Sequence, residues 1–87
     1  MSKIKKQLIR LQSNPKDFTF EELEALLIGI GFILSNAGGT SGSAVRFKHP
    51  ETGQIIRLHR PHPLPILKQY LIKYIVNSLK QGGYLDE

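Results

Sequence analysis

Residues 43–60 decide the fold, and their sequence is SAVRFKHPETGQIIRLHR. Apolar and polar side chains alternate in both halves of this stretch, which is the period of a β-strand with one buried face. The segment between the halves, residues 50–53, has the proline and glycine of a tight turn. We therefore expect two antiparallel strands, residues 43–49 and 54–60, joined as a hairpin.

Pairing His49 with Gln54 across the turn sets the register of this hairpin. Two pairs then face the core and two face the opposite side: Val45–Leu58 and Phe47–Ile56, and Ala44–His59 and Arg46–Arg57. Two arginines directly opposite each other destabilise a sheet unless an anion lies between them. The outer face of the hairpin is therefore a candidate anion site.

Three segments with the helical spacing of apolar residues flank the hairpin. The first is residues 2–11. The second begins at a capping box, Thr19 to Glu22, and ends at Gly31. The third is residues 66–81, and it ends at a pair of glycines. Its expected buried stripe comprises Leu67, Tyr70, Leu71, Tyr74, Ile75, Ser78 and Leu79.

A short apolar stretch, residues 32–35, predicts one more strand, whereas residues 36–42 are too polar and glycine-rich for regular structure. The expected fold class is α+β, with a three-stranded antiparallel sheet covered on its apolar face by the second and third helices. The 87 residues provide for one domain, with an N-terminal helical extension over 1–17 and a core over 19–85.

The chain has a formal net charge of +5, and its acidic residues gather early while its basic residues dominate later. This distribution favours a polyanionic partner. The lack of cysteine excludes disulfides and thiolate metal sites and fits a reducing cytosol. We find neither a signal peptide pattern nor the run of about 18 apolar residues that a membrane span needs, and we expect a cytoplasmic protein without a membrane partner.

Two groups of residues are candidates for phosphate binding. The backbone and hydroxyls of the glycine-serine loop, which includes Gly42 and Ser43, could hold a phosphate, or the loop could be an ordinary flexible connection. The side chains of Arg46, Lys48 and Arg57 could form a phosphate-binding stripe, or they could be solvated strand residues.

His59 and His62 are the candidate catalytic residues. A histidine beside arginines at the end of an exposed strand could act as a general acid or base on RNA, with the RNA's own 2′-hydroxyl as nucleophile. The alternative is a structural role in the proline-rich segment, and this alternative is stronger for His62, which lies between two prolines. Their spacing matches no metal site, so we expect neither a metal nor another cofactor. We expect His49, beside the turn, to be exposed, and the tyrosines of the last helix to lie in the core.

Four segments, taken in order, resemble the HicA family, the toxins of HicA–HicB toxin–antitoxin pairs. They are Ile28-Gly29-Ile30-Gly31-Phe32, Ser41-Gly42-Ser43, Lys48-His49-Pro50 and Leu58-His59-Arg60-Pro61-His62-Pro63. The resemblance covers residues 19–85 and implies a double-stranded-RNA-binding-domain-like fold. It further implies an mRNA interferase, a metal-independent endoribonuclease that cleaves messenger RNA, and an acidic HicB-like antitoxin that covers the active site.

Many members of the family place the catalytic histidine at the position of Ala44. The alanine could be a substitution that permits expression of a toxic protein, a natural variant that uses another histidine, or the mark of a chain that binds RNA without cutting it. Because His59 is expected directly across from Ala44, we hypothesise that its imidazole serves in place of the usual one, with Arg60 among the RNA-binding residues. The alternatives are a non-catalytic RNA-binding module and a protein-interaction domain with an acidic partner.

Overall fold

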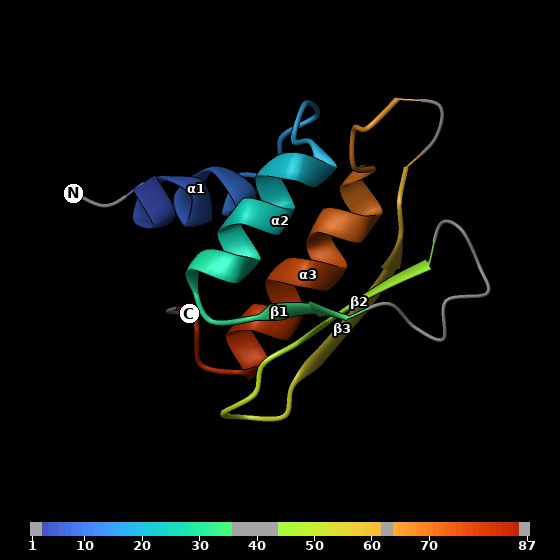
Figure 1. The fold of residues 1–87 in the computed structure, drawn as a ribbon. Helices are drawn as coiled ribbons and strands as arrows, with labels where there is room; N and C mark the ends of the chain where they lie inside the picture. The colour runs from blue at the N-terminus through green and yellow to red at the C-terminus, as the bar shows by residue number, and fades with distance from the viewer. Residues whose placement is uncertain (1–2, 36–43, 62–63, 86–87) are drawn as a thin grey trace.

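A computed structural model describes residues 3–35, 44–61 and 64–85 of the chain (Figure 1). The elements follow the expected order, with helix α1 (Lys3–Gln12), helix α2 (Phe20–Gly29) and strand β1 (Ile33–Ser35) in the first half. Strands β2 (Ala44–Lys48) and β3 (Ile55–His59) and helix α3 (Gln69–Gln81) complete the fold. The fold is α+β, as the sequence predicts.

The sheet is an antiparallel meander in the order β1-β2-β3. At its turn, the His49 N–H donates to the Gln54 carbonyl at 2.9 Å and the Gly53 N–H donates to the His49 carbonyl at 2.7 Å. Gly53 has a φ of 78°, which a glycine adopts without strain. The predicted register is confirmed at all four pairs that follow: Ala44–His59, Val45–Leu58, Arg46–Arg57 and Phe47–Ile56.

The helices cover one face of this sheet, and α1 lies beyond α2 and α3 (Figure 1). The inward strand residues, led by Phe47 and Ile56, join a single buried cluster with residues of all three helices. Its fully buried side chains include Leu11, Phe18, Leu23, Leu26, Leu27, Phe32, Leu67, Ile72, Ile75 and Leu79. The cluster is one core, so the fold is organised around helices packed on one face of a sheet.

Helix α2 starts as the sequence predicts. The Thr19 hydroxyl accepts from the Glu22 N–H at 3.1 Å, and the Glu22 carboxylate accepts from the Thr19 N–H at 3.1 Å. Phe18 and Leu23 are both fully buried, as expected for the residues that flank such a cap. Burial by itself raises the pKa of Glu22, but hydrogen bonds from Thr19, Gln7 and Arg10, together with the Arg10 charge, lower it overall.

The N-terminal extension packs on the helices through α1. Leu11 is buried, and Arg10 forms ion pairs with Glu22 at 2.7 Å and with Asp17 at 3.0 Å. Ile4 approaches α2 at Gly29, where a Cβ would collide with its side chain. The extension is therefore built into the fold.

Helix α3 differs from expectation in where it starts. It begins at Gln69, three residues late, because the preceding segment is held extended against the start of α2. Ile66 forms an isolated antiparallel bridge with Thr19, and the Leu67 N–H donates to the Phe18 carbonyl at 2.8 Å. These contacts take the chain out of helical geometry until Lys68.

The buried face of α3 also differs from expectation. Tyr70 is 71% exposed and Tyr74 is 42% exposed, so their predicted place in the core is wrong, and Ser78 is only half-buried. The buried positions are Ile72, Ile75 and Leu79. At about 100° per residue, both tyrosines lie on the side of the helix opposite to these residues. The expected stripe was too wide, because it combined the buried face with part of the exposed one.

Candidate nucleic-acid interface

The outward face of the sheet carries side chains in three rows set by the strand register. These rows are Ala44 with His59, Ser35 with Arg46 and Arg57, and Ile33 with Lys48 and Ile55. Within the described segments, no helix covers this face, and Ile33, Lys48, Arg57 and His59 are all exposed. We call it the open face.

The middle row of the open face holds two guanidinium groups on neighbouring strands. Arg46 is half-buried and donates from Nη2 to the Ser35 hydroxyl at 3.3 Å. Its Nε is buried and has no acceptor among the residues that the structure describes. Neither Arg46 nor Arg57 pairs with a carboxylate in the described part of the chain. Two adjacent cations without a neutralising acid attract an anion such as a phosphate.

The end row of the open face pairs Ala44 with His59. The His59 side chain is exposed, so it does not turn into the core. A cavity of about 210 Å³ opens here, lined by Ala44, Val45, Arg57, Leu58 and His59. The hollow therefore brings together the His59 imidazole, Arg57 and Ala44. Ala44 stands at the position where the family resemblance implies a histidine.

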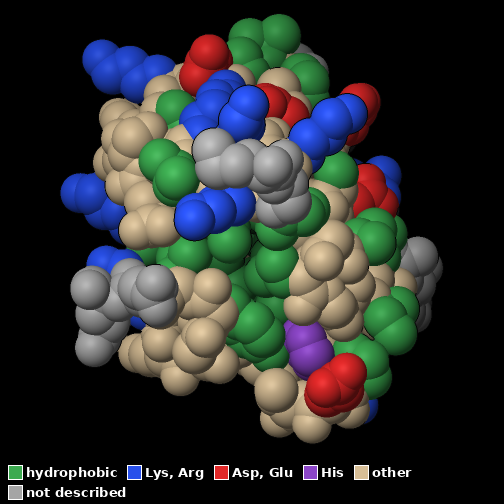
Figure 2. All heavy atoms as spheres, turned by 90° about the vertical axis from the view of Figure 1, so that its left-hand side faces the viewer, with side chains coloured by type: hydrophobic (Ala, Val, Ile, Leu, Met, Phe, Trp, Pro, Cys, Tyr) green, Lys and Arg blue, Asp and Glu red, His purple; other side chains and the backbone are tan. Residues whose placement is uncertain are grey.

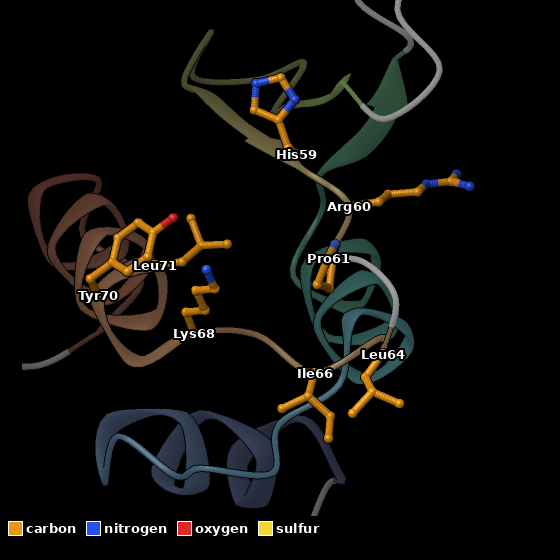
Figure 3. A pocket seen from close by; sticks show the side chains of 8 residues that line it. All are labelled: His59, Arg60, Pro61, Leu64, Ile66, Lys68, Tyr70 and Leu71. Atoms are coloured by element: carbon orange, nitrogen blue, oxygen red, sulfur yellow. The ribbon is translucent and has the colours of Figure 1, made fainter.

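A larger cavity of about 440 Å³ lies on the other side of His59, between the end of β3 and the start of α3. In Figure 3, His59 lies above the opening, while Lys68, Tyr70 and Leu71 gather on the side of α3. Tyr70 and Lys68 were not predicted as site residues from the sequence. A helical projection centred on Ile72, Ile75 and Leu79 would have placed Tyr70 outside, although only the folded chain brings it near His59.

Arg60, just after β3, also lines the larger cavity. Its guanidinium sits over the Phe20 ring, 5.2 Å from the centroid, and its side chain points away from the others in Figure 3. It lines a third cavity together with Glu21 and Glu24. Of the remaining predicted site residues, Lys48 is on the open face near the turn, whereas Gly42, Ser43 and His62 lie outside the described residues.

His49 is 6% exposed, so the prediction that it is exposed is wrong. Its Nδ1 accepts from the Glu51 N–H at 3.3 Å, which leaves Nε2 to donate to the Ile30 carbonyl at 3.2 Å. The ring also packs edge-on against Phe32, with centroids 5.1 Å apart. These contacts assign His49 to the scaffold that joins the hairpin turn to the end of α2.

The side of the molecule that carries α1 and α2 has a mixed charge. Figure 2 shows Lys and Arg side chains there with Asp and Glu side chains among them. Arg10 of α1 forms ion pairs with Asp17 and with Glu22 of α2. Positive charge is thus partly neutralised there, in contrast to the paired arginines of the open face.

A metal site and a membrane-spanning helix would each need a recognisable arrangement of residues. Across 3–35, 44–61 and 64–85, no group of three or more His, Cys, Asp or Glu side chains is placed to hold a metal ion. None of the helices in these ranges has the length and apolar character needed to cross a membrane.

Residues 20–84 match a protein-family model described as HicA toxin of bacterial toxin–antitoxin. The match spans β1, β2, β3, α2 and α3 and begins after α1. The comparisons with curated proteins and with solved structures gave no match.

Proposed function

Because the chain belongs to the HicA toxin family of bacterial toxin–antitoxin systems, we propose that it binds and cleaves messenger RNA as a metal-independent endoribonuclease. The observation that carries this proposal is the Arg46–Arg57 row of the open face directly beside exposed His59. Arginine neutralises phosphate, and histidine moves protons near neutral pH. The two arginines and His59 lie in neighbouring rows of the same surface.

In the proposed reaction, His59 acts on the RNA's own 2′-hydroxyl. The imidazole removes the hydroxyl proton as a general base, and the 2′-oxygen attacks the adjacent phosphorus. The bond from phosphorus to the 5′-oxygen breaks, leaving a 2′,3′-cyclic phosphate, and the departing oxygen takes a proton from the imidazolium or from water. Arg46 and Arg57 stabilise the charge that develops on the phosphate oxygens.

The other predicted residues have supporting parts in this proposal. Lys48 extends the cationic stripe along the open face, and Arg60 contacts RNA beyond it. Gly42 and Ser43 orient the phosphate, and His62 is the reserve candidate for proton transfer. No step requires a cofactor.

A second candidate function is RNA binding without cleavage. Ala44 favours it, because the family resemblance implies a catalytic histidine at this position and a methyl group moves no proton. The open face retains both arginines in this case, so binding persists while the chemistry is lost.

Cleavage of a long messenger RNA in excess chelator distinguishes the two functions. The chain is compared with His59→Ala and with Ala44→His. Cleavage by the chain that is lost in His59→Ala supports the ribonuclease. Cleavage by Ala44→His alone overturns catalysis by His59 and supports the binding module.

The family also implies an antitoxin partner. We propose that this partner is an acidic, HicB-like protein that covers the open face, since acidic side chains complement paired arginines. If the open face served only a protein partner, RNA binding by the chain would be weak and barely dependent on salt. Phosphate contacts instead give a steep dependence.

A further inference from the structure

The cavity between β3 and α3 combines apolar walls with cationic and aromatic groups. Leu64, Ile66 and Leu71 supply apolar surface, Lys68 supplies an ammonium group and Tyr70 supplies a ring that is 71% exposed. In Figure 3 the Lys68 side chain extends into the space between α3 and β3, and the Tyr70 ring stands beside it. Among the described residues, no hydrogen bond or ion pair holds the Lys68 ammonium.

We propose that this cavity binds one unstacked base of single-stranded RNA, next to the phosphate that His59 handles. The proposal rests on the RNA-binding function above and adds a subsite to it. Tyr70 provides the stacking surface, and Lys68 meets the phosphate attached to that nucleotide. His59 lines this cavity as well as the smaller hollow at Ala44. The base and the scissile phosphate would therefore occupy adjoining sites.

The chemistry of the cavity favours a nucleotide over other occupants. Its volume of about 440 Å³ lies within the range of roughly 300–1,000 Å³ that is usual for small-ligand sites. A nucleotide has an apolar, flat base and an anionic phosphate, which match the apolar wall, the ring and the ammonium group. None of the described residues that line the cavity has a carboxylate, so none of them repels a phosphate.

A pocket for an unstacked base favours single-stranded RNA over duplex RNA. A base inside a duplex has both faces covered by its neighbours, and it reaches a side pocket only after unpairing and unstacking. Because the pocket needs a free base, the chain should bind single-stranded RNA more tightly than duplex RNA of the same sequence. This preference is expected although the fold is similar to that of a double-stranded-RNA-binding domain.

The test measures binding of a single-stranded 2′-O-methyl oligoribonucleotide, which lacks the nucleophile and cannot be cleaved. Tyr70→Ala should weaken binding about 5- to 100-fold, as expected for loss of one base–aromatic stack. Tyr70→Phe keeps the ring and should recover most of that loss. Lys68→Ala should weaken binding, whereas Lys73→Ala, a lysine of α3 outside the cavity, serves as the matched control and should leave it unchanged.

A set of oligonucleotides with one abasic position each locates the base. At one position, removing the base should weaken binding to the unsubstituted chain as much as Tyr70→Ala weakens binding to the intact oligonucleotide. The Tyr70→Ala variant should bind this abasic oligonucleotide and the intact one equally well. The subsite would be overturned if the losses of affinity from the abasic change and from Tyr70→Ala were additive. It would also be overturned if the affinity of Tyr70→Ala for the intact oligonucleotide were within twofold of that of the unsubstituted chain. Equal affinity for the duplex would overturn it as well.

The same variants keep the two proposals distinguishable. If the chain shows the Tyr70 coupling but cleaves no RNA, the subsite stands and the ribonuclease proposal fails. If the chain cleaves RNA and Tyr70→Ala has no effect, the subsite alone fails. Since Tyr70 is largely exposed, its substitutions leave the core intact, and circular dichroism checks this.

Discussion

The two ends of the β2–β3 hairpin carry one histidine each, and the two histidines have opposite environments. At the turn end, His49 is buried, and both ring nitrogens bond to backbone groups of the scaffold. At the open end, His59 is exposed beside Arg57 and between two cavities. The same kind of side chain thus holds the fold together at one end and lies on the exposed surface at the other.

The difference follows from strand alternation. Val45 and Phe47 point inward along β2, and the next position of the same parity is His49. On β3, Ile56 and Leu58 point inward, so His59 has the outward parity. Parity, and not proximity to a turn, therefore decides which histidine can be functional.

The largest expected effect concerns the open end. Replacing His59 by Ala should lower RNA cleavage about 100- to 10,000-fold, the usual contribution of a general acid or base. The melting temperature should hardly change, because the side chain is exposed. Cleavage in chelator and thermal unfolding of the same sample give both values. Undiminished cleavage, or a large loss of stability, would contradict the assignment.

The turn end should respond in the opposite way. Replacing His49 by Ala should lower the free energy of unfolding by about 2–4 kcal/mol, because the change removes a buried ring and leaves the Ile30 carbonyl without its donor. Denaturant titration measures this loss. RNA affinity per folded molecule should stay the same, and a specific loss of affinity would place His49 in the site.

A smaller effect is expected from substituting the glycine that His49 contacts at the end of α2. A second glycine, away from any contact, serves as the control for backbone strain. Gly31 has a φ of 109°, and a Cβ there would lie 2.5 Å from Nε2 of His49. Gly53 has a φ of 78°, but a Cβ there would meet nothing within 4 Å. Gly31→Ala should therefore cost about 1–3 kcal/mol of stability and more than the control Gly53→Ala. Equal losses of stability in the two variants would show that the His49 ring moves aside without destabilising the fold.

The cations of the open face should act through salt dependence. Arg57→Ala should weaken RNA binding and reduce the slope of log affinity against log salt by about 0.7–1, as for one lost phosphate contact. Lys73→Ala, on α3 and outside the face, is the matched control. An unchanged slope in Arg57→Ala would remove this residue from the interface.

The smallest effect lies far from both ends, at the contact between α1 and α2. The lowered pKa of Glu22 means that its charge contributes stability above the ordinary value of 4.5, and that this contribution is lost as the pH falls through the lowered pKa. The chain should therefore be more stable than Glu22→Gln near neutral pH, with the difference fading in acid. A constant difference across this range, measured by thermal unfolding, would show that the Glu22 charge is not the cause.

The hairpin could be predicted from the sequence because its register depends on local alternation and one tight turn. The Arg46–Arg57 and Ala44–His59 pairs follow directly from that register. The start of α3 could not be predicted, since it depends on Leu67 bonding to Phe18 across the fold. Nor could the cavity beside His59, which forms only where the end of β3 meets Tyr70 of α3.

The most direct test of the account compares the histidines in one spectrum. The chain has three histidines, and their imidazole signals can be followed by NMR during titration with an uncleavable single-stranded RNA. The account predicts that the His59 signals shift as the RNA binds while those of buried His49 stay in place. Unmoved His59 signals at saturation, or equal shifts of both residues, would contradict it.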